Sequence, residues 1–223
     1  MLDYGCLSEA LPEAFIDFIH ERLELELCLF GKLLYPGFHF IPCGYEVGKS
    51  FVSVNLASLF AGLGKRVLLI DADLRKGRLH KEFGIKRNKG LSQILLHSAT
   101  VEEVISKTEV ENLEIIQCGN VPSNPSELLG SKYFTSLIDQ LKNQYDIIII
   151  DTPPIMLVTD AALACRVTSQ IVMVIEYNRH SIEAIKDGMK QLLKGNNNIH
   201  ASLVINKYEH GLNDGYGYKY GKY

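Results

Sequence analysis

Five short and nearly unbroken apolar runs constrain the fold of this chain more than any other feature of its sequence. The runs are rich in β-branched residues and alternate with segments of helical apolar spacing. A half-exposed strand would alternate polar and apolar residues, so continuous apolar runs indicate strands that are buried on both faces. This pattern predicts an α/β fold with a doubly wound, mostly parallel sheet and helices on both faces. The predicted strands are 67–72, 113–117, 146–151, 171–176 and 202–206, after a weaker first strand at 38–41.

Segments with helical spacing separate these strands, and turn residues flank most of them. A chain of 223 residues with 47% hydrophobic residues can build the core of one globular domain, so a second full domain is not expected. The predicted helices cover residues 49–62, 91–97, 101–107, 131–143, 160–167 and 181–194.

Composition argues against several classes of protein. The formal net charge of −3 does not favour sequence-independent binding of nucleic acid, which normally needs a strongly basic face. The five cysteines are widely spread and form no CxxC pair, which indicates reduced thiols in cytosol. No apolar run reaches the roughly 18 residues of a membrane span. We therefore expect a cytoplasmic protein that meets the inner face of a membrane only through a partner.

The tripeptide Gly48-Lys49-Ser50 lies between the weak first strand and the first predicted helix, where a P-loop would lie. In a P-loop, backbone N–H groups at the helix start bind phosphate, the lysine reaches the β and γ oxygens, and the serine hydroxyl ligates Mg²⁺. The full GxxxxGK[ST] pattern has a glycine where this chain has Cys43. The tripeptide alone therefore fits an ordinary helix start with a surface lysine equally well.

Three aspartates at strand ends favour the P-loop interpretation. Asp71 and Asp73 lie two residues apart at the end of LLIDAD, and Asp151 ends the run IIIID. Ligands bind at the carboxyl ends of strands in open α/β sheets, and residues two apart on a strand face the same way. Two carboxylates there supply a Mg²⁺ ligand and a base, and Asp151 is similar to a Walker B aspartate. Any one of them could instead cap a turn, but the combination favours a P-loop NTPase.

The motifs together resemble the catalytic domain of the bacterial tyrosine kinases that regulate capsule and exopolysaccharide synthesis. The resemblance runs from about Glu46 to the C-terminus. It divides the chain into a divergent N-terminal segment at 1–45, a P-loop kinase domain at 46–207 and a tyrosine-rich tail at 208–223. The segments that carry it are EVGKSFVSVNLA, VLLIDADLRKG, GLSQIL, VPSNPSELL, YDIIIIDTPPI and TDAAL.

The resemblance implies ATP and Mg²⁺ as cofactors and assigns roles to the site residues. Gly48 and Lys49 would bind the ATP phosphates, and Asp71 would be the base for the incoming tyrosine hydroxyl. The implied Mg²⁺ ligands are Ser50, Asp73 and Asp151.

Arg75 belongs to the DxDxR element of the family. The resemblance implies that it contacts phosphate or a neighbouring subunit, with a surface salt bridge as the alternative. Residues 124–127 match a family loop, but their spacing predicts no chemical role. Partitioning ATPases of similar fold carry a signature lysine where this chain has Gly44, and they lack a terminal tyrosine cluster.

The first 45 residues depart from the family pattern. Tyr45 stands where these kinases usually have proline, and Ile16 and Ile19 stand at the arginine positions of an oligomerisation motif that would begin at Glu13. Either the segment is divergent and assembly is weakened, or it is translated from a shifted reading frame. The chain is either the separate kinase partner of a membrane activator or a truncated fusion with one.

The tail from Gly211 to Tyr223 alternates glycine and tyrosine and lacks aliphatic residues beyond Leu212, so we expect its tyrosines to be exposed. The leading interpretation is an ATP-dependent protein-tyrosine autokinase that phosphorylates this tail between subunits and regulates polysaccharide synthesis and export. The implied partners are a membrane polysaccharide co-polymerase or activator, further copies of the chain and a cognate tyrosine phosphatase. The alternatives are a catalytically impaired ATP-binding scaffold and a partitioning-type ATPase switch. The expected phosphorylation sites are Tyr216, Tyr218, Tyr220 and Tyr223.

Overall fold

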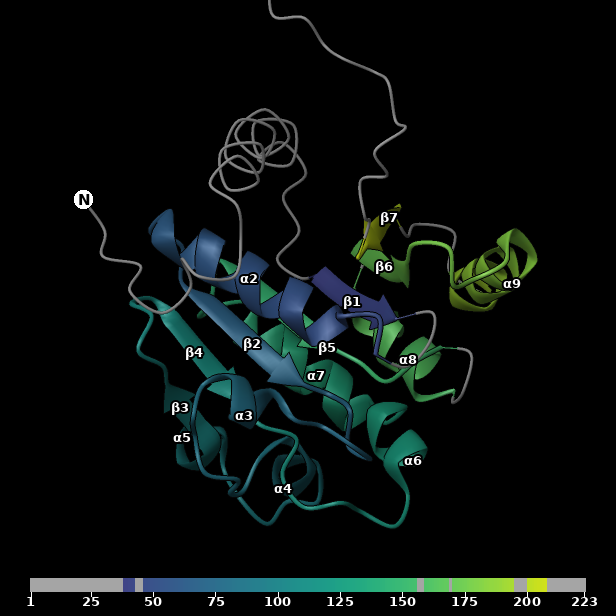
Figure 1. The fold of residues 1–223 in the computed structure, drawn as a ribbon. Helices are drawn as coiled ribbons and strands as arrows, with labels where there is room; N and C mark the ends of the chain where they lie inside the picture. Colours follow the sequence, from purple (N-terminus) through teal and green to yellow (C-terminus); the bar gives the residue numbers. More distant parts are fainter. Residues whose placement is uncertain (1–37, 43–45, 156–158, 169, 195–199, 208–223) are drawn as a thin grey trace, which may run out of the picture. The chain divides into compact units, whose positions relative to one another are not determined.

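The computed structural model describes residues 38–42, 46–155, 159–168, 170–194 and 200–207, all within one compact unit (Figure 1). Several expectations fall outside these residues. They concern the oligomerisation motif in the first 37 residues, the Cys43 to Tyr45 part of the phosphate-binding loop, and the four tail tyrosines.

A seven-stranded sheet forms the centre of the described structure, in the strand order β3-β4-β2-β5-β1-β6-β7. All neighbouring strands are parallel except β3 and β4, which are antiparallel. The predicted doubly wound, mostly parallel α/β fold is therefore confirmed. The strands are β1 Phe38–Pro42, β2 Val67–Asp71, β3 Ile105–Lys107, β4 Leu113–Ile116, β5 Ile147–Asp151, β6 Gln170–Glu176 and β7 His200–Asn206.

Helices cover both faces of the sheet, with α2 on the face opposite α7 (Figure 1). Two short helices, α3 and α6, were not predicted. Each has only about one turn, which is too short for a periodic spacing of apolar residues to be visible in the sequence. The start of α6 does carry a signal, since proline is favoured at the first position of a helix. The helical elements are α2 Lys49–Gly62, α3 Leu79–Glu82, α4 Leu91–Leu95, α5 Val101–Val104, α6 Pro125–Leu129, α7 Lys132–Leu141, α8 Asp160–Ala164, the 3₁₀ turn η1 Cys165–Val167 and α9 Ile182–Leu193.

One predicted helix was wrong in its second half. The helix expected over residues 101–107 ends at Val104, and Ile105–Lys107 form β3. Ile105 adopts an extended backbone, pairs with Ile116 of β4 and packs against the core beside it. Pairing with the edge of β4 satisfies the backbone N–H and C=O groups of residues 105–107. This pairing is a long-range contact, so the spacing of apolar residues along the segment does not predict it.

Alternation along β2 and β5 decides which side chains reach the site. Leu68 and Ile70 of β2 pack with Ile148 and Ile150 of β5 in a core that includes Phe134 of α7. The intervening residues point to the opposite face, on which α2 lies. Asp71 and Asp151 are register partners in the parallel pairing of β2 with β5. Both aspartates therefore end their strands on the α2 face.

A second core cluster lies beside β6, where Ile171 and Met173 pack with Ala161 of α8 and Leu192 of α9. No helix in the described part of the chain is both long enough and apolar enough to cross a membrane.

Candidate functional site

The candidate site begins at the turn before α2. Gly48 has a left-handed φ of 82°, and a Cβ on this residue would lie 2.2 Å from Nδ2 of Asn206. The same Nδ2 donates to the carbonyl O of Val47 at 2.9 Å. The left-handed conformation favours glycine at position 48, and a side chain there would also displace the Asn206 amide from Val47. The turn presents the unpaired N–H groups of a 14-residue helix, which is the geometry that binds phosphate.

Lys49 and Ser50 both contact the end of β5. Lys49 Nζ lies 2.7 Å from Oδ2 of Asp151 and donates to the carbonyl O of Thr152 at 2.7 Å. Ser50 Oγ donates to the same Oδ2 of Asp151 at 3.1 Å. Three residues that the sequence predicted as site residues therefore meet, although 101 positions separate Ser50 from Asp151 along the chain.

Ser53 is a site residue that sequence reasoning missed. Its Oγ lies 3.4 Å from Oδ1 of Asp151 and donates to the carbonyl O of Ser50 at 3.0 Å. Ser53 is fully buried, one helical turn after Ser50. Its i, i+3 spacing from Ser50 on an apolar helix was the available signal. Together, Lys49, Ser50 and Ser53 contact both oxygens of the Asp151 carboxylate.

Two adjacent carboxyl groups are buried at this end of the sheet. Asp71 is 0% exposed and Asp151 is 2% exposed. Burial raises the pKa of Asp71 to about 7, and the Asp151 charge adds to this effect while Lys49 opposes it. Burial also raises the pKa of Asp151, again against the opposing charge of Lys49. Lys49 therefore favours the charged form of both carboxyl groups, against the effect of burial on their pKa.

The loop after β2 encloses Asp71. The carboxyl oxygens of Asp71 accept the N–H groups of Asp73 at 3.2 Å and Leu79 at 3.1 Å. A Cβ on Gly77 would lie 2.5 Å from Oδ2 of Asp71, so this glycine lets the loop close over the carboxyl group. The loop backbone therefore shields the predicted base from solvent.

Asp73 has a different environment from Asp71. It lies beyond the end of β2, so the loop sets its direction and strand alternation does not. Its Oδ1 accepts the N–H groups of Arg75 at 3.2 Å and Lys76 at 2.9 Å, and the residue is half-buried. The sequence predicted that the carboxylates of Asp71 and Asp73 would lie together. In the structure only the carboxylate of Asp73 is open to a ligand.

Arg75 joins the loop after β2 to two helices. Its Nε lies 2.7 Å from Oδ2 of Asp160 in α8, and its Nη2 lies 3.3 Å from Oγ of Ser126 in α6. Ser126 Oγ also donates to Oδ1 of Asp160 at 2.5 Å. The ion pair that was the alternative for Arg75 is present, and contact with phosphate or a neighbouring subunit stays a prediction. The motifs NPSE and TDAAL, which had no assigned chemistry, supply the partners of Arg75.

The donor groups suit a metal ion that arrives with a nucleotide. No group of three or more His, Cys, Asp or Glu side chains in the described residues could hold a metal by itself. Ser50 and Asp151 are 3.1 Å apart, and Asp73 lies on the adjacent loop. Mg²⁺ is usually bound by one or two carboxylates, with waters and substrate phosphates as its other ligands. These residues therefore fit a Mg²⁺–nucleotide complex.

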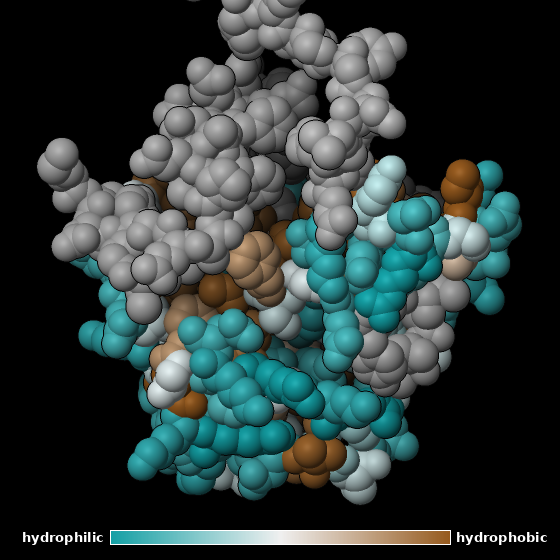
Figure 2. Space-filling model, viewed as in Figure 1, coloured by the Kyte–Doolittle hydropathy of each residue, from teal (hydrophilic) through white to brown (hydrophobic). Residues whose placement is uncertain are grey.

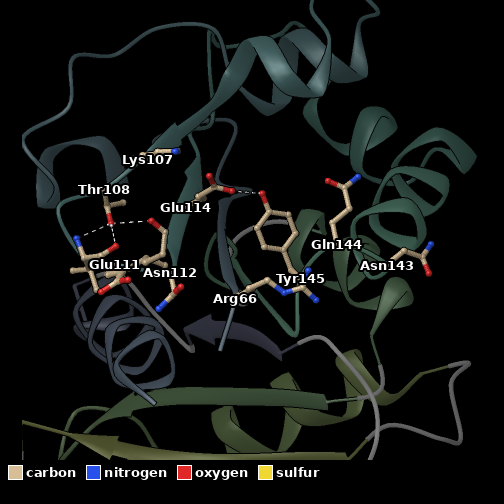
Figure 3. Close-up of a pocket in the computed structure, with 11 residues that line it drawn as sticks. Arg66, Lys107, Thr108, Glu111, Asn112, Glu114, Asn143, Gln144 and Tyr145 are labelled. Atoms are coloured by element: carbon tan, nitrogen blue, oxygen red, sulfur yellow. Dashed lines mark hydrogen bonds between the residues drawn. The ribbon is translucent and has the colours of Figure 1, made fainter. Parts of the chain in front are cut away.

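A pocket of about 720 Å³ lies at the other end of the strands, around Arg66 and Glu114 (Figure 3). Several of its polar groups already have partners. Arg66 pairs with Asp146 at 2.9 Å, and the hydroxyl of Tyr145 donates to Glu114 at 2.5 Å. Burial is the main cause that raises the pKa of this tyrosine. Ligands of open α/β sheets bind at the carboxyl ends of strands, so this pocket is not the candidate site.

Comparison with known proteins adds to this geometry. A family profile described as an AAA domain matches residues 45–207. Tyrosine-protein kinase ptk of Acinetobacter johnsonii is 42% identical over 164 residues, which cover 74% of this chain and 20% of ptk. CapB of Staphylococcus aureus is 38% identical over 175 residues, which cover 78% of this chain and 76% of CapB.

A solved structure gives the same result. The kinase domain of Escherichia coli tyrosine kinase ETK matches this fold with a TM-score of 0.72 at 32% identity, over 81% of this chain and 72% of that domain. The chain spans 20% to 24% of the length of its longer relatives, ptk and EpsB.

Proposed function

This chain belongs to the AAA-domain family of bacterial tyrosine-protein kinases, and we propose that it is an ATP- and Mg²⁺-dependent protein-tyrosine kinase. The observation that carries the proposal is the convergence of Lys49 and Ser50 on Asp151, beside the buried Asp71. Phosphoryl transfer is mainly a matter of positioning and charge stabilisation, which such a site supplies.

The P-loop residues would bind and orient the nucleotide. The N–H groups at the start of α2 and the ammonium of Lys49 would bind phosphate oxygens, while Ser50, Asp151 and Asp73 would hold Mg²⁺. Lys49 now neutralises Asp151 at 2.7 Å. A divalent cation on Asp151 would take over that neutralisation and leave Lys49 to contact phosphate. ATP supplies the phosphoryl group, and Mg²⁺ offsets the negative charge of its phosphates.

Asp71 is the proposed acceptor of the tyrosine proton. A base with a pKa near the working pH is efficient, and the pKa of Asp71 is raised to about 7. In the transfer, the tyrosine oxygen bonds to the γ phosphorus, its proton passes to the carboxylate, and the bond to the bridging oxygen breaks to release ADP. The loop from Asp73 to Leu79 covers Asp71, so this role requires that loop to open.

The substrates and partners belong to the same proposal. The acceptor hydroxyls are the tail tyrosines Tyr216, Tyr218, Tyr220 and Tyr223 of a neighbouring copy, in a segment poor in aliphatic residues. Relatives of the chain are named tyrosine-protein kinases, among them one in a cps region of Klebsiella pneumoniae. We propose that phosphorylation regulates polysaccharide synthesis and export, with a membrane activator and a tyrosine phosphatase as partners.

Incubation of the purified chain with ATP and Mg²⁺, followed by detection of phosphotyrosine, tests the proposal. Phosphotyrosine should form in the wild type and should disappear when EDTA removes Mg²⁺. Nucleotide binding without phosphotyrosine would contradict the proposal and favour the impaired scaffold, which the departures at Cys43 and Tyr45 support. Hydrolysis of ATP without phosphotyrosine would favour the ATPase switch.

A further inference from the structure

Strand β7 ends the sheet with an open edge. It is the last strand in the sheet order, and within the described residues it pairs with β6 alone (Figure 1). The N–H and C=O groups on its outer side therefore have no strand partner there, and an unpaired edge of this kind is a template for another strand. The opposite edge is protected, because β3 has only three residues and one of them is Lys107.

Two apolar side chains of β7 are exposed beside the second core cluster. Leu203 and Ile205 are 46% and 54% exposed, although their register partners Met173 and Ile175 are buried in the cluster with Leu192 of α9. By contrast, Figure 2 shows mainly hydrophilic residues over the region where Figure 1 draws α3. The apolar face of the core therefore continues beyond β6 to an edge strand that the described helices leave half exposed, and covering it would be favourable.

The chain leaves the described residues at this same edge. Lys207 follows β7 directly and has a left-handed φ of 55°, a conformation typical of turns. The connection 207–214, KYEHGLND, contains Gly, Asn and Asp, which favour turns, and it leads to a run of glycine and tyrosine. Parallel strands need a crossover of roughly a dozen residues or more, so a segment joined to β7 by this connection can pair with it only in the antiparallel direction.

The tail has the alternation of a strand. In GYGYKYG, residues 215–221, Tyr216, Tyr218 and Tyr220 stand two residues apart, a period that places all three rings on one face of an extended segment. Helical geometry would spread the same rings around the axis. Tyrosine is enriched in strands and glycine is depleted, so the run predicts a strand of low intrinsic stability that needs the edge of another strand.

We propose that residues 215–221 fold back onto β7 of the same chain and add an antiparallel strand to its outer edge, with the three tyrosine rings against Leu203 and Ile205. Aromatic rings opposite aliphatic side chains form favourable cross-strand pairs. A slip by one residue would place glycine and Lys219 against the apolar side chains instead, which disfavours the other register. A tethered segment has an effective concentration in the roughly millimolar range, so it is favoured over the β7 edge of a second copy.

The docked tail withholds its own tyrosines from phosphorylation, a consequence that rests on the proposed kinase function. Asp71 ends β2, and the strands β5, β1 and β6 lie between β2 and β7. Four strand spacings amount to roughly 19 Å, so tyrosines docked on β7 are held away from the site. Transfer therefore requires release of the tail first. Phosphates on tyrosines about 7 Å apart on one strand face would repel one another, so modification disfavours redocking.

Hydrogen exchange of the full-length, phosphatase-treated chain without ATP tests the docking independently of catalysis. The reference is the free peptide GYGYKYGKY, residues 215–223. We expect the backbone amides of residues 215–221 to exchange at least roughly tenfold more slowly in the chain than in the peptide, because pairing with β7 shields them from solvent. Exchange at the rate of the free peptide would overturn the proposal.

The variant Leu203→Thr/Ile205→Thr removes the apolar face of the edge but keeps residues that favour strands, so the protection of residues 215–221 should be lost. The matched control Val121→Thr/Ile182→Thr changes two apolar side chains that are 59% and 66% exposed elsewhere, and it should keep the protection. Equal effects of the two variants would overturn the proposal.

A second variant leaves β7 itself unchanged. Tyr216→Ser/Tyr218→Ser/Tyr220→Ser should remove the rings that cover the edge and speed the exchange of residues 200–206. Docking within one chain does not depend on protein concentration, so the wild-type protection should be the same from about 1 μM to about 100 μM. Protection that rises with concentration would overturn the proposal and assign the edge to a second copy.

The initial rate of tail phosphorylation gives a separate readout. Leu203→Thr/Ile205→Thr should raise this rate by up to roughly tenfold, the factor by which docking lowers the population of free tail, whereas the control should keep the wild-type rate. Protection of the wild-type tail without any phosphotyrosine would contradict the kinase proposal and not the docking. Loss of protection with an unchanged rate would overturn the withholding of the tyrosines and not the kinase proposal.

Discussion

At the scale of single residues, Lys49 supplies positive charge to two buried carboxyl groups. It lowers the pKa of both Asp71 and Asp151 against the effect of burial, and its Nζ contacts Asp151 directly. The side chains of the ion pair are 10% and 3% exposed, so solvent screens the pair little. Without nucleotide, the same lysine would stabilise the fold. With nucleotide bound, it would contact phosphate.

Replacing Lys49 by Met should therefore have two effects. Phosphoryl transfer should be abolished and ATP affinity should fall strongly, because the charge on the phosphates is lost. Without nucleotide, the free energy of unfolding should fall by about 3 kcal/mol, since Asp151 loses its buried partner. Urea denaturation measures the second effect, and Lys49→Arg, which keeps the charge, is the control. Unchanged phosphotyrosine formation in Lys49→Met would remove the P-loop assignment.

Asparagine variants of Asp71 and Asp73 should distinguish the proposed base from the proposed metal ligand. Asp71→Asn keeps the shape of the side chain but cannot accept a proton, and its single amide oxygen can keep only one of the two hydrogen bonds that the loop donates to Asp71. ATP should still bind while transfer falls by about 10²-fold to 10⁴-fold. Asp73→Asn should instead raise the Mg²⁺ concentration that half-maximal activity needs. Titrations of activity against Mg²⁺ compare the two variants. The opposite assignment of effects would exchange the proposed roles of Asp71 and Asp73.

At the scale of elements, the loop after β2 is attached to α6 and α8 through Arg75. Asp160 is fully buried, whereas the Arg75 side chain is 42% exposed, so only one end of the ion pair is shielded from water. Ser126 provides a second hydrogen bond to Asp160. The position of the loop that encloses Asp71 therefore depends on helices far from it in sequence.

Arg75→Ala should lower the free energy of unfolding by about 1 to 3 kcal/mol, because it leaves the buried Asp160 without its cation. The double variant Arg75→Ala/Asp160→Asn should recover part of this loss, and the coupling energy between the two positions measures the ion pair. A large loss of ATP affinity in Arg75→Ala, with stability unchanged, would instead show that Arg75 acts on phosphate.

At the scale of the whole molecule, the parallel sheet brings the chemistry to one edge. Gly48, Asp71 and Asp151 belong to separate βα units, and the sheet order places β2, β5 and β1 side by side. Parallel strands end on the same side, so residues at their carboxyl ends converge. The 720 Å³ pocket lies at the opposite, amino ends of the strands.

Replacement of Tyr216, Tyr218, Tyr220 and Tyr223 by Phe should remove most autophosphorylation and leave ATP binding intact. The reason is that the nucleotide site and the acceptor segment are separate parts of the chain in the proposed function. Mass spectrometry locates the phosphates, and calorimetry with ATP verifies the site. Phosphates found mainly outside the tail in the wild type would contradict the proposed acceptors.

The amino-acid sequence by itself predicted every strand of the described sheet except β3, and it singled out residues at the strand ends that the fold brings together. Continuous apolar runs predict doubly buried strands, and the strands observed at Val67–Asp71 and Ile147–Asp151 match them within a residue. The helix Lys49–Gly62 has the predicted bounds. Local patterns suffice there because burial, capping and strand ends depend on residues close together in the chain.

Only the tertiary structure decided how these positions are connected. It showed β3 in place of a predicted half-helix, the closure of the loop over Asp71, Asn206 beside Gly48, and Arg75 bound to Asp160. Asn206 and Asp160 lie 159 and 85 residues from their partners Val47 and Arg75, so no local pattern contains these contacts. A polar side chain at a strand end can cap a turn, bind a ligand or form an ion pair. Which of these roles it has depends on the other elements that the fold places beside it.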